Sequence, residues 1–114
     1  MGKKEREFFS PDGLEWTVAG SGYEGIKGVF EKVLSADETG SITRLLKFEA
    51  GVETRETLTH DFWEEVIILK GGLIDRAKRQ VFTEGMYACR PPGMKHGPYS
   101  APVGCITFEI RYYK

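Results

Sequence analysis

The stretch GMYACRPPGMKHGPYS, residues 85–100, holds the turn chemistry that decides the fold of this chain. Gly85 allows a tight turn into a short β-rich run. The Pro-Pro-Gly corner at 91–93 ends that run, because proline donates no ladder hydrogen bond and glycine tolerates a reversal of chain direction. His96 then begins the returning segment. The spacing G-x5-P-x-G-x2-H therefore predicts a histidine held close to a stiff turn between two strands.

The second informative stretch is THDFWEEVIILKGG, residues 59–72, which reads H-x3-E-x6-G from His60 through Glu64 to Gly71. The chain has 2 histidines, and these two stretches hold both. Imidazole and carboxylate groups are common ligands of divalent metals. Taken alone, His60 and Glu64 fit either half of a metal site or two polar residues at the edge of an ordinary strand.

Short β-rich runs separated by glycine and proline fill most of the chain. They lie at 28–35, 41–50, 62–70, 80–84, 85–90 and 105–113. Short strands bounded by turn residues are typical of antiparallel sandwiches and barrels. The last run alternates between an apolar face and a polar face, formed by Ile106, Phe108, Ile110 and Tyr112 and by Thr107, Glu109 and Arg111. The sequence therefore predicts an all-β fold.

Composition narrows the class of protein. The 114 residues suffice for one domain, and 40% hydrophobic residues, 29% charged residues and a net charge of −1 give no electrostatic reason to expect nucleic-acid or membrane binding. No run reaches the length of a transmembrane helix, and no signal-peptide core follows the basic start. We expect a cytoplasmic protein, in which Cys89 and Cys105 are reduced, with a bridge between neighbouring strands as the alternative.

Further motifs surround the two histidine stretches. They are GSITRLLKFEAG at 40–51, EEVIILKGG at 64–72, PPGMKHGPYS at 91–100 and GCITF at 104–108. Together these stretches resemble the RmlC-like cupin superfamily, and within it the group of anti-sigma-factor cupin domains and acetylacetone-cleaving dioxygenases. The resemblance covers residues 26–113, about four-fifths of the chain. It implies a single jelly-roll β-barrel at 26–114, with residues 1–25 as an N-terminal arm on the barrel or on a dimer partner.

The resemblance also implies a divalent metal in the barrel mouth, which the family usually holds with three histidines and one glutamate. Carried over to this sequence, the ligands are His60, Glu64 and His96. The family's first histidine is missing, because the position two before His60 is Leu58. The remaining two imidazoles and one carboxylate suit Fe, Mn, Zn or Ni with open positions for water or substrate.

The degraded first motif leaves alternatives open. Counting forward from Gly51 places the missing ligand at Thr57, and this one-residue mismatch predicts a bulge or extra residue in the strand. Glu65 is an alternative carboxylate ligand, and Glu56 is an alternative fourth ligand that alternation places on the same face as Leu58. A metal-free cupin that uses its pocket for binding alone is a further alternative.

The resemblance implies an enzyme, either a dioxygenase or an isomerase or cyclase, that acts on an enolisable carbonyl or an aromatic, polyketide-like small molecule. The residues expected to bind that substrate are Leu58, Trp63, Tyr87, Arg90 and Tyr99. Arg90 is costly inside a strand unless it is paired, so it either points outward or binds something. The alternative from another class is a non-catalytic small-molecule-binding or sensor cupin.

The composition of the N-terminal arm predicts a partner subunit. Residues 1–25 contain the large apolar side chains of Phe8, Phe9, Leu14 and Trp16, which are too many for a free tail. A barrel this short also leaves apolar sheet surface uncovered. We therefore expect a homodimer that forms through the β-faces or the arm.

Overall fold

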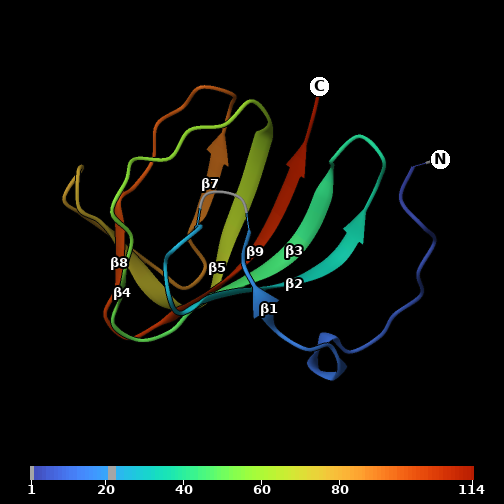
Figure 1. Ribbon diagram of the computed structural model, residues 1–114, viewed down its shortest axis with the longest axis horizontal. Coiled ribbons are helices and arrows are strands. Elements are labelled where there is room, and N and C mark those ends of the chain that lie inside the picture. Colours follow the sequence, from blue (N-terminus) through green and yellow to red (C-terminus); the bar gives the residue numbers. More distant parts are fainter. Residues whose placement is uncertain (1, 21–22) are drawn as a thin grey trace.

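The computed structural model describes residues 2–20 and 23–114, and almost all of its regular structure is β-sheet. In chain order the elements are η1 (Pro11–Gly13), β1 (Thr17–Val18), β2 (Val29–Ala36), β3 (Ile42–Phe48), β4 (Val52–Glu53), β5 (Trp63–Asp75), β6 (Gln80–Thr83), β7 (Tyr87–Arg90), β8 (Tyr99–Ala101) and β9 (Cys105–Tyr112). The strands form one strongly curled antiparallel sheet, as Figure 1 shows. The predicted all-β fold is confirmed. Within the described residues, no helix has the length and hydropathy needed to cross a membrane.

Strand β5 is the centre of the sheet. The strand order is β1-β2-β3-β9-β5-β8-β4, and β6 and β7 also pair with β5. Residues 63–71 of β5 pair with β9, whereas residues 72–75 pair with β6, so one strand serves both sides of the curl. The sequence placed the end of this strand at residue 70, and the structure continues it by five residues to Asp75.

Two glycines explain the longer strand. A Cβ atom on Gly71 would lie 2.1 Å from the carbonyl oxygen of Gly104, and one on Gly72 would lie 2.7 Å from that of Phe82. The φ of Gly71 is also positive, at 74°. Any other residue at Gly71 would be strained, so the glycine pair bends the strand instead of ending it.

The inward-facing residues of β3, β9 and β5 form rows across the sheet, and these rows change character along the strands. Their register is Phe48 with Cys105, then Leu46, Thr107 and Ile68, then Arg44, Glu109 and Val66, and finally Arg111 with Glu64. The interior is therefore apolar at one end and charged at the other. We call the two regions the apolar end and the charged end.

The alternation predicted for β9 is present, with the polar face turned inward. Thr107, Glu109 and Arg111 are 1%, 5% and 9% exposed. The apolar residues of the opposite face are only half-buried on the outside of the sheet: Ile106, Phe108, Ile110 and Tyr112. A polar interior and an apolar exterior are the reverse of an ordinary strand.

Ion pairs compensate part of the buried charge. Arg44 donates from Nε to Glu109 Oε1 at 2.9 Å and from Nη1 to Glu31 Oε1 at 2.8 Å. The second oxygen of Glu109 accepts a hydrogen bond from the Thr107 hydroxyl at 3.0 Å. Buried charges are tolerated when they are paired and hydrogen-bonded in this way.

The N-terminal arm runs along the outer side of β2 and ends beyond it in Figure 1. The buried Lys32 holds it there, donating to the carbonyl of Pro11 at 2.9 Å and lying 4.6 Å from the centre of the Trp16 ring. Arg6 also donates to the carbonyl of Leu34 at 3.0 Å. Phe8, by contrast, is fully exposed.

Candidate metal site

Three separate segments supply the candidate ligands. Glu64 lies on the inner face of β5, His60 lies just before that strand, and His96 follows the corner after β7. The corner is tied to the first segment, because Gly93 donates its amide to the His60 carbonyl at 2.9 Å. Leu58 and His96 also exchange two backbone hydrogen bonds, of 2.7 and 3.0 Å. Backbone pairing therefore positions both histidines.

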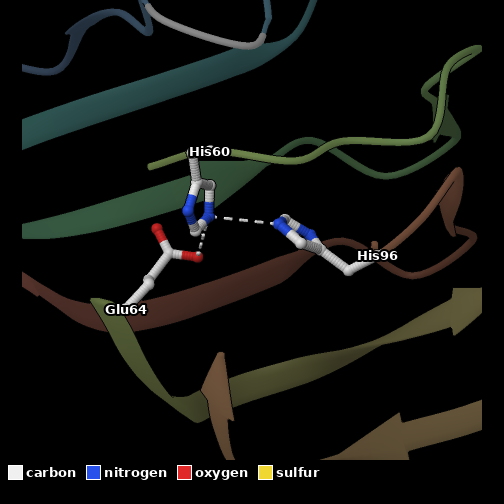
Figure 2. A group of neighbouring side chains, drawn as sticks. All are labelled: His60, Glu64 and His96. Carbon is white, nitrogen blue, oxygen red and sulfur yellow. Dashed lines mark hydrogen bonds and ion pairs between the residues drawn. The ribbon is translucent and has the colours of Figure 1, made fainter. Parts of the chain in front are cut away.

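The three side chains converge on one point, as Figure 2 shows. The Nε2 atoms of His60 and His96 are 3.2 Å apart, and His60 Nε2 is 3.6 Å from Glu64 Oε1. One ligand atom from each residue lies within 4.8 Å of the others. Two ligands at about 2.1 Å from a metal are separated by about 3.0–3.4 Å in octahedral cis or tetrahedral positions. The two shorter separations are close to this range, so the residues fit a divalent ion.

The hydrogen bonds to Nδ1 prepare both imidazoles as ligands. His60 Nδ1 lies 3.1 Å from the Phe62 carbonyl oxygen, which accepts only, so this nitrogen carries the proton. His96 Nδ1 lies 3.3 Å from the Tyr99 hydroxyl, which already accepts a hydrogen bond from Arg90 at 2.7 Å. The proton on His60 Nδ1 leaves a lone pair on His60 Nε2 that points at the shared position, and the Tyr99 hydroxyl holds the His96 ring in place through Nδ1. Such outer partners orient the histidine ligands of metal sites.

The charges around the site favour a neutral imidazole and an ionised carboxylate. Burial and, after it, the positive charge of Arg90 lower the pKa of His96 to about 3. Burial alone raises the pKa of Glu64, but His60 and Arg90 outweigh it and bring this pKa to about 2. Arg90 itself donates to Glu64 Oε1 at 3.0 Å. Near pH 7 His96 is therefore neutral and Glu64 ionised, the charge states in which these groups bind a cation.

Arg90 and Tyr99 lie beside the ligands, as expected of substrate-binding residues. Arg90 is half-buried and donates hydrogen bonds to both Glu64 and the Tyr99 hydroxyl, so it has the partners that a charged residue in a strand requires. Burial raises the pKa of Tyr99 to about 12, which keeps the hydroxyl protonated. Leu58 lines the same small cavity as the three ligands, about 50 Å³ in volume.

Trp63 and Tyr87 are not brought together with the ligands. Trp63 is adjacent to Glu64 in the strand, so it points to the outer face, where it stacks on Tyr112 with 6.5 Å between ring centres. Tyr87 touches the rim of a neighbouring cavity, but its hydroxyl donates to Glu65 Oε1 at 2.5 Å on the outer face. Alternation thus places Trp63 away from the cavities, against expectation, whereas Tyr87 lines the larger cavity beside the site although its hydroxyl is bound to Glu65.

The two alternative acids are also placed apart from the histidines. Glu65 accepts hydrogen bonds from the hydroxyls of Tyr87 and Tyr112 on the outer face, and Glu56 is exposed. Neither belongs to the cluster of possible ligands in the described residues. Glu64 is thus the carboxylate that lies with His60.

The extra residue predicted for this segment is present between Gly51 and His60. Glu53 pairs with Ser100 and Leu58 pairs with His96, so the first segment advances by one residue more than the second. Strand β4 ends at Glu53, and the chain then runs irregularly, with one bridging pair at Leu58. Hydrogen bonds to other segments replace a ladder here: Thr54 exchanges backbone and hydroxyl hydrogen bonds with Tyr99 of β8. The one-residue mismatch in the motif reflects this irregular path.

Five residues that line the small cavity were not among the predicted site residues: Tyr23, Arg44, Thr59, Phe62 and Arg111. The Phe62 ring stacks on His60 with 3.8 Å between ring centres, and the Arg111 guanidinium lies 4.4 Å from the centre of the same ring. Burial lowers the pKa of Arg111, and the nearby charge of Arg44 lowers it further. The polar face of β9 was the signal for Arg111, but the sequence did not say which face is inside.

A second cavity, of about 110 Å³, adjoins the site on the far side of His96. Its walls are mostly apolar, with Val66, Ile68, Leu73, Phe82, Met86 and Met94 among the lining residues, and Arg90, His96 and Tyr99 form part of it. The volume is below the several hundred Å³ typical of pockets for drug-sized ligands. Space beside the three ligands therefore suits a small molecule.

Comparison with known proteins places this geometry in a family. The family model of the ChrR cupin-like domain matches residues 4–111. No curated protein sequence matches the chain.

Solved structures show the same fold at low identity. An RmlC-like cupin from Shewanella frigidimarina is 19% identical with a TM-score of 0.70, over 97% of this chain and 93% of that one. An acetylacetone dioxygenase from Acinetobacter johnsonii is 18% identical with a TM-score of 0.73, over 94% and 74%. The anti-sigma factor ChrR of Rhodobacter sphaeroides, in complex with SigE, is 19% identical with a TM-score of 0.65. That match covers 89% of this chain and 50% of the other.

Proposed function

Because this chain belongs to the family of ChrR cupin-like domains, we propose that it is a small metal-dependent enzyme whose ion is held by His60, Glu64 and His96. The observation that carries the proposal is the convergence of these ligand atoms within 4.8 Å from three segments. Fe, Mn, Zn and Ni all accept such a mixed nitrogen and oxygen set. The substrate class is an enolisable carbonyl compound, with an aromatic or polyketide-like skeleton as one form.

The chemistry follows from the donor set and its surroundings. A divalent ion in this site supplies Lewis acidity that stabilises an enolate, and a redox-active ion also supports chemistry with O2. The protein's residues shape the rest of the site: Leu58 provides an apolar wall where the family has a further histidine. Arg90 fixes the orientation of the Glu64 carboxylate and of the Tyr99 hydroxyl. The apolar cavity beyond His96 suits the carbon skeleton of a small substrate.

The neighbouring glutamates provide a matched test of the metal site. Glu64→Gln removes the proposed carboxylate ligand, and Glu65→Gln makes the same change on the outer face. Elemental analysis of protein purified without chelators should find about one metal per chain in the wild type and in Glu65→Gln, and little in Glu64→Gln or His96→Ala. A wild-type protein that retains no metal after reloading with Fe, Mn, Zn and Ni in turn would contradict the proposal.

Reaction type is tested separately with the metal-loaded protein. A panel of β-diketones is incubated with and without O2, and oxygen uptake and product are followed. Oxygen consumption in step with substrate loss identifies a dioxygenase, whereas product formed without O2 identifies an isomerase or cyclase. Binding without turnover under both conditions supports the alternative function, a non-catalytic sensor, which the likeness to ChrR also favours.

The assembly in this proposal is a cytoplasmic homodimer. Ile67 and Leu69 of β5 are 37% and 50% exposed on the outer face, beside the half-buried apolar residues of β9. Burying such a continuous apolar face against a second copy removes it from water. Cys89 and Cys105 are both free, in keeping with a reducing compartment. Light scattering at tens of micromolar should give twice the chain mass, and a monomer there would contradict the dimer.

A further inference from the structure

Three arginines lie at the charged end, Arg44 and Arg111 buried and Arg90 half-buried, and two of the three are hydrogen-bonded to acceptors of the protein. Arg44 donates to two glutamates at 2.8–2.9 Å. Arg90 donates to Glu64 at 3.0 Å and to the Tyr99 hydroxyl at 2.7 Å. Hydrogen bonds of this length satisfy a guanidinium that burial has removed from water.

Arg111 differs from the other two. It is directly opposite Glu64 in the β5–β9 register and only 9% exposed, yet its closest carboxylate contact is 3.9 Å, from Nη2 to Glu64 Oε2. Among residues 2–20 and 23–114, its side chain has this ion pair and the contact with the Phe62 ring but no hydrogen bond to the protein. Arg111 lines the small cavity, and no fully buried side-chain nitrogen in the described residues lacks a partner, so its free donors stay within reach of solvent or of a ligand in that cavity.

The charge balance indicates what those donors bind. Three arginines and three glutamates form ion pairs here, so their charges cancel. They are Arg44, Arg90, Arg111, Glu31, Glu64 and Glu109. A divalent ion on His60, Glu64 and His96 adds two positive charges beside Arg111. The loaded site is then cationic and has room for an anion next to the ion.

We infer that Arg111 binds a carboxylate group of the substrate, so the substrate class narrows to small oxo-acids whose enolisable oxygens lie next to that carboxylate. This inference rests on the proposed metal-dependent function. A guanidinium presents paired donors that match the two oxygens of a carboxylate. Phe62 keeps the guanidinium in place from one side by stacking, and Leu58 offers an apolar surface for the carbon chain.

A charged and an uncharged form of one probe test the inference. 2,4-Dioxovalerate and its methyl ester carry the same two β-diketone oxygens, but only the first has a carboxylate. Calorimetric titration of the zinc-loaded protein should show the acid binding about tenfold or more tighter than the ester. Arg111→Gln should lose this preference while keeping its zinc and its affinity for the ester, and Arg111→Lys should retain part of it. Arg55→Gln, which removes the same charge from an exposed loop, should behave as wild type.

A second measurement keeps the inference independent of metal binding. In chelator-treated protein, the NMR signal of the Arg111 Nε–H group, assigned by its loss in Arg111→Gln, should move on addition of acetate and stay still with acetamide. A wild-type preference that survives in Arg111→Gln, or equal binding of the two probes by zinc-loaded wild type, would overturn the inference. If the protein holds no zinc, the proposed function fails, and an Arg111 signal that acetate leaves unmoved would then overturn this inference too.

Discussion

The apolar end and the charged end of the interior are built on the same three strands, and both are buried. At the apolar end, Leu46 is 0% exposed and packs with Phe48 and Ile68, so that burial itself is favourable. At the charged end, Arg44 is 4% exposed, and its burial is tolerable only because Glu31 and Glu109 pair with it. The difference shows that low exposure alone does not identify a stabilising residue. What each side chain contacts decides whether it supports the fold or forms the site.

The largest effect should come from breaking a pair at the charged end. Arg44→Met keeps most of the side-chain volume but leaves the buried Glu109 without its cation, which should cost about 3–5 kcal/mol of unfolding free energy. Urea unfolding followed by circular dichroism measures this cost. The double variant Arg44→Met/Glu109→Met should recover much of the loss, because an apolar pair replaces the ion pair. Equal stability of the single and double variants would contradict the pairing.

A truncation at the apolar end should cost slightly less and spare the site. Leu46→Ala removes a fully buried side chain, so its loss of transfer free energy and the resulting cavity should destabilise the protein by about 2–5 kcal/mol. The folded fraction should still bind metal in the wild-type ratio, because Leu46 lies two rows from the Arg111–Glu64 pair. Metal stoichiometry that falls together with stability would show that the two ends are not separable.

A smaller effect should appear as a pH dependence of the metal-free protein. The pKa of His96 is about 3 in the folded chain and 6.5 in the unfolded chain. Between these two pH values the unfolded chain therefore binds a proton at His96 and the folded chain does not. Stability should therefore fall as the pH drops from 6.5 towards 3, by up to about 1.4 kcal/mol per pH unit. Below 4.5 the lowered pKa of Glu64 adds to the loss in the same direction. Urea unfolding between pH 6.5 and 5 should give a flatter profile in His96→Gln, and an unchanged slope would argue against a neutral buried His96.

The smallest expected change tests whether Leu58 belongs to the ligand site at the charged end. Leu58 pairs with His96 through the backbone and lines the ligand cavity, so Leu58→His places a third imidazole beside the proposed ion. Zinc affinity, measured by competition with a chelator, should rise about tenfold, and activity should fall because the apolar wall is lost. Leu58→Met, which keeps that wall apolar, is the control. Unchanged zinc affinity in Leu58→His would show that the Leu58 side chain does not reach the site.

The sequence was sufficient for the residues whose positions follow from local turn chemistry. The corner at 91–93 predicted that His96 lies beside a stiff turn, whereas the grouping of His60, Glu64 and His96 as ligands came from the resemblance to the cupin superfamily. Trp63 was expected at the substrate site but lies on the outer face. Alternation along the strand already implied this, because Trp63 is the neighbour of the inward-facing Glu64. Arg111 was missed for a different reason: both faces of β9 carry residues that can be buried, and only the packing of the whole sheet determines which face is inside.

Asp75, at the end of β5, contacts the segment that carries His96, so the bend at Gly71 and Gly72 also affects the metal site. Its Oδ2 accepts the backbone amide of Gly97, the residue after His96, at 3.4 Å, while the start of the same strand carries Glu64. One bent strand thus fixes two of the three ligands relative to each other before any ion arrives. Binding then costs little conformational entropy for these two side chains, because folding has already ordered them. The ion meets a preorganised pair, and His60 is held independently of the bent strand, by the Gly93 amide at its carbonyl and by the stacked Phe62 ring.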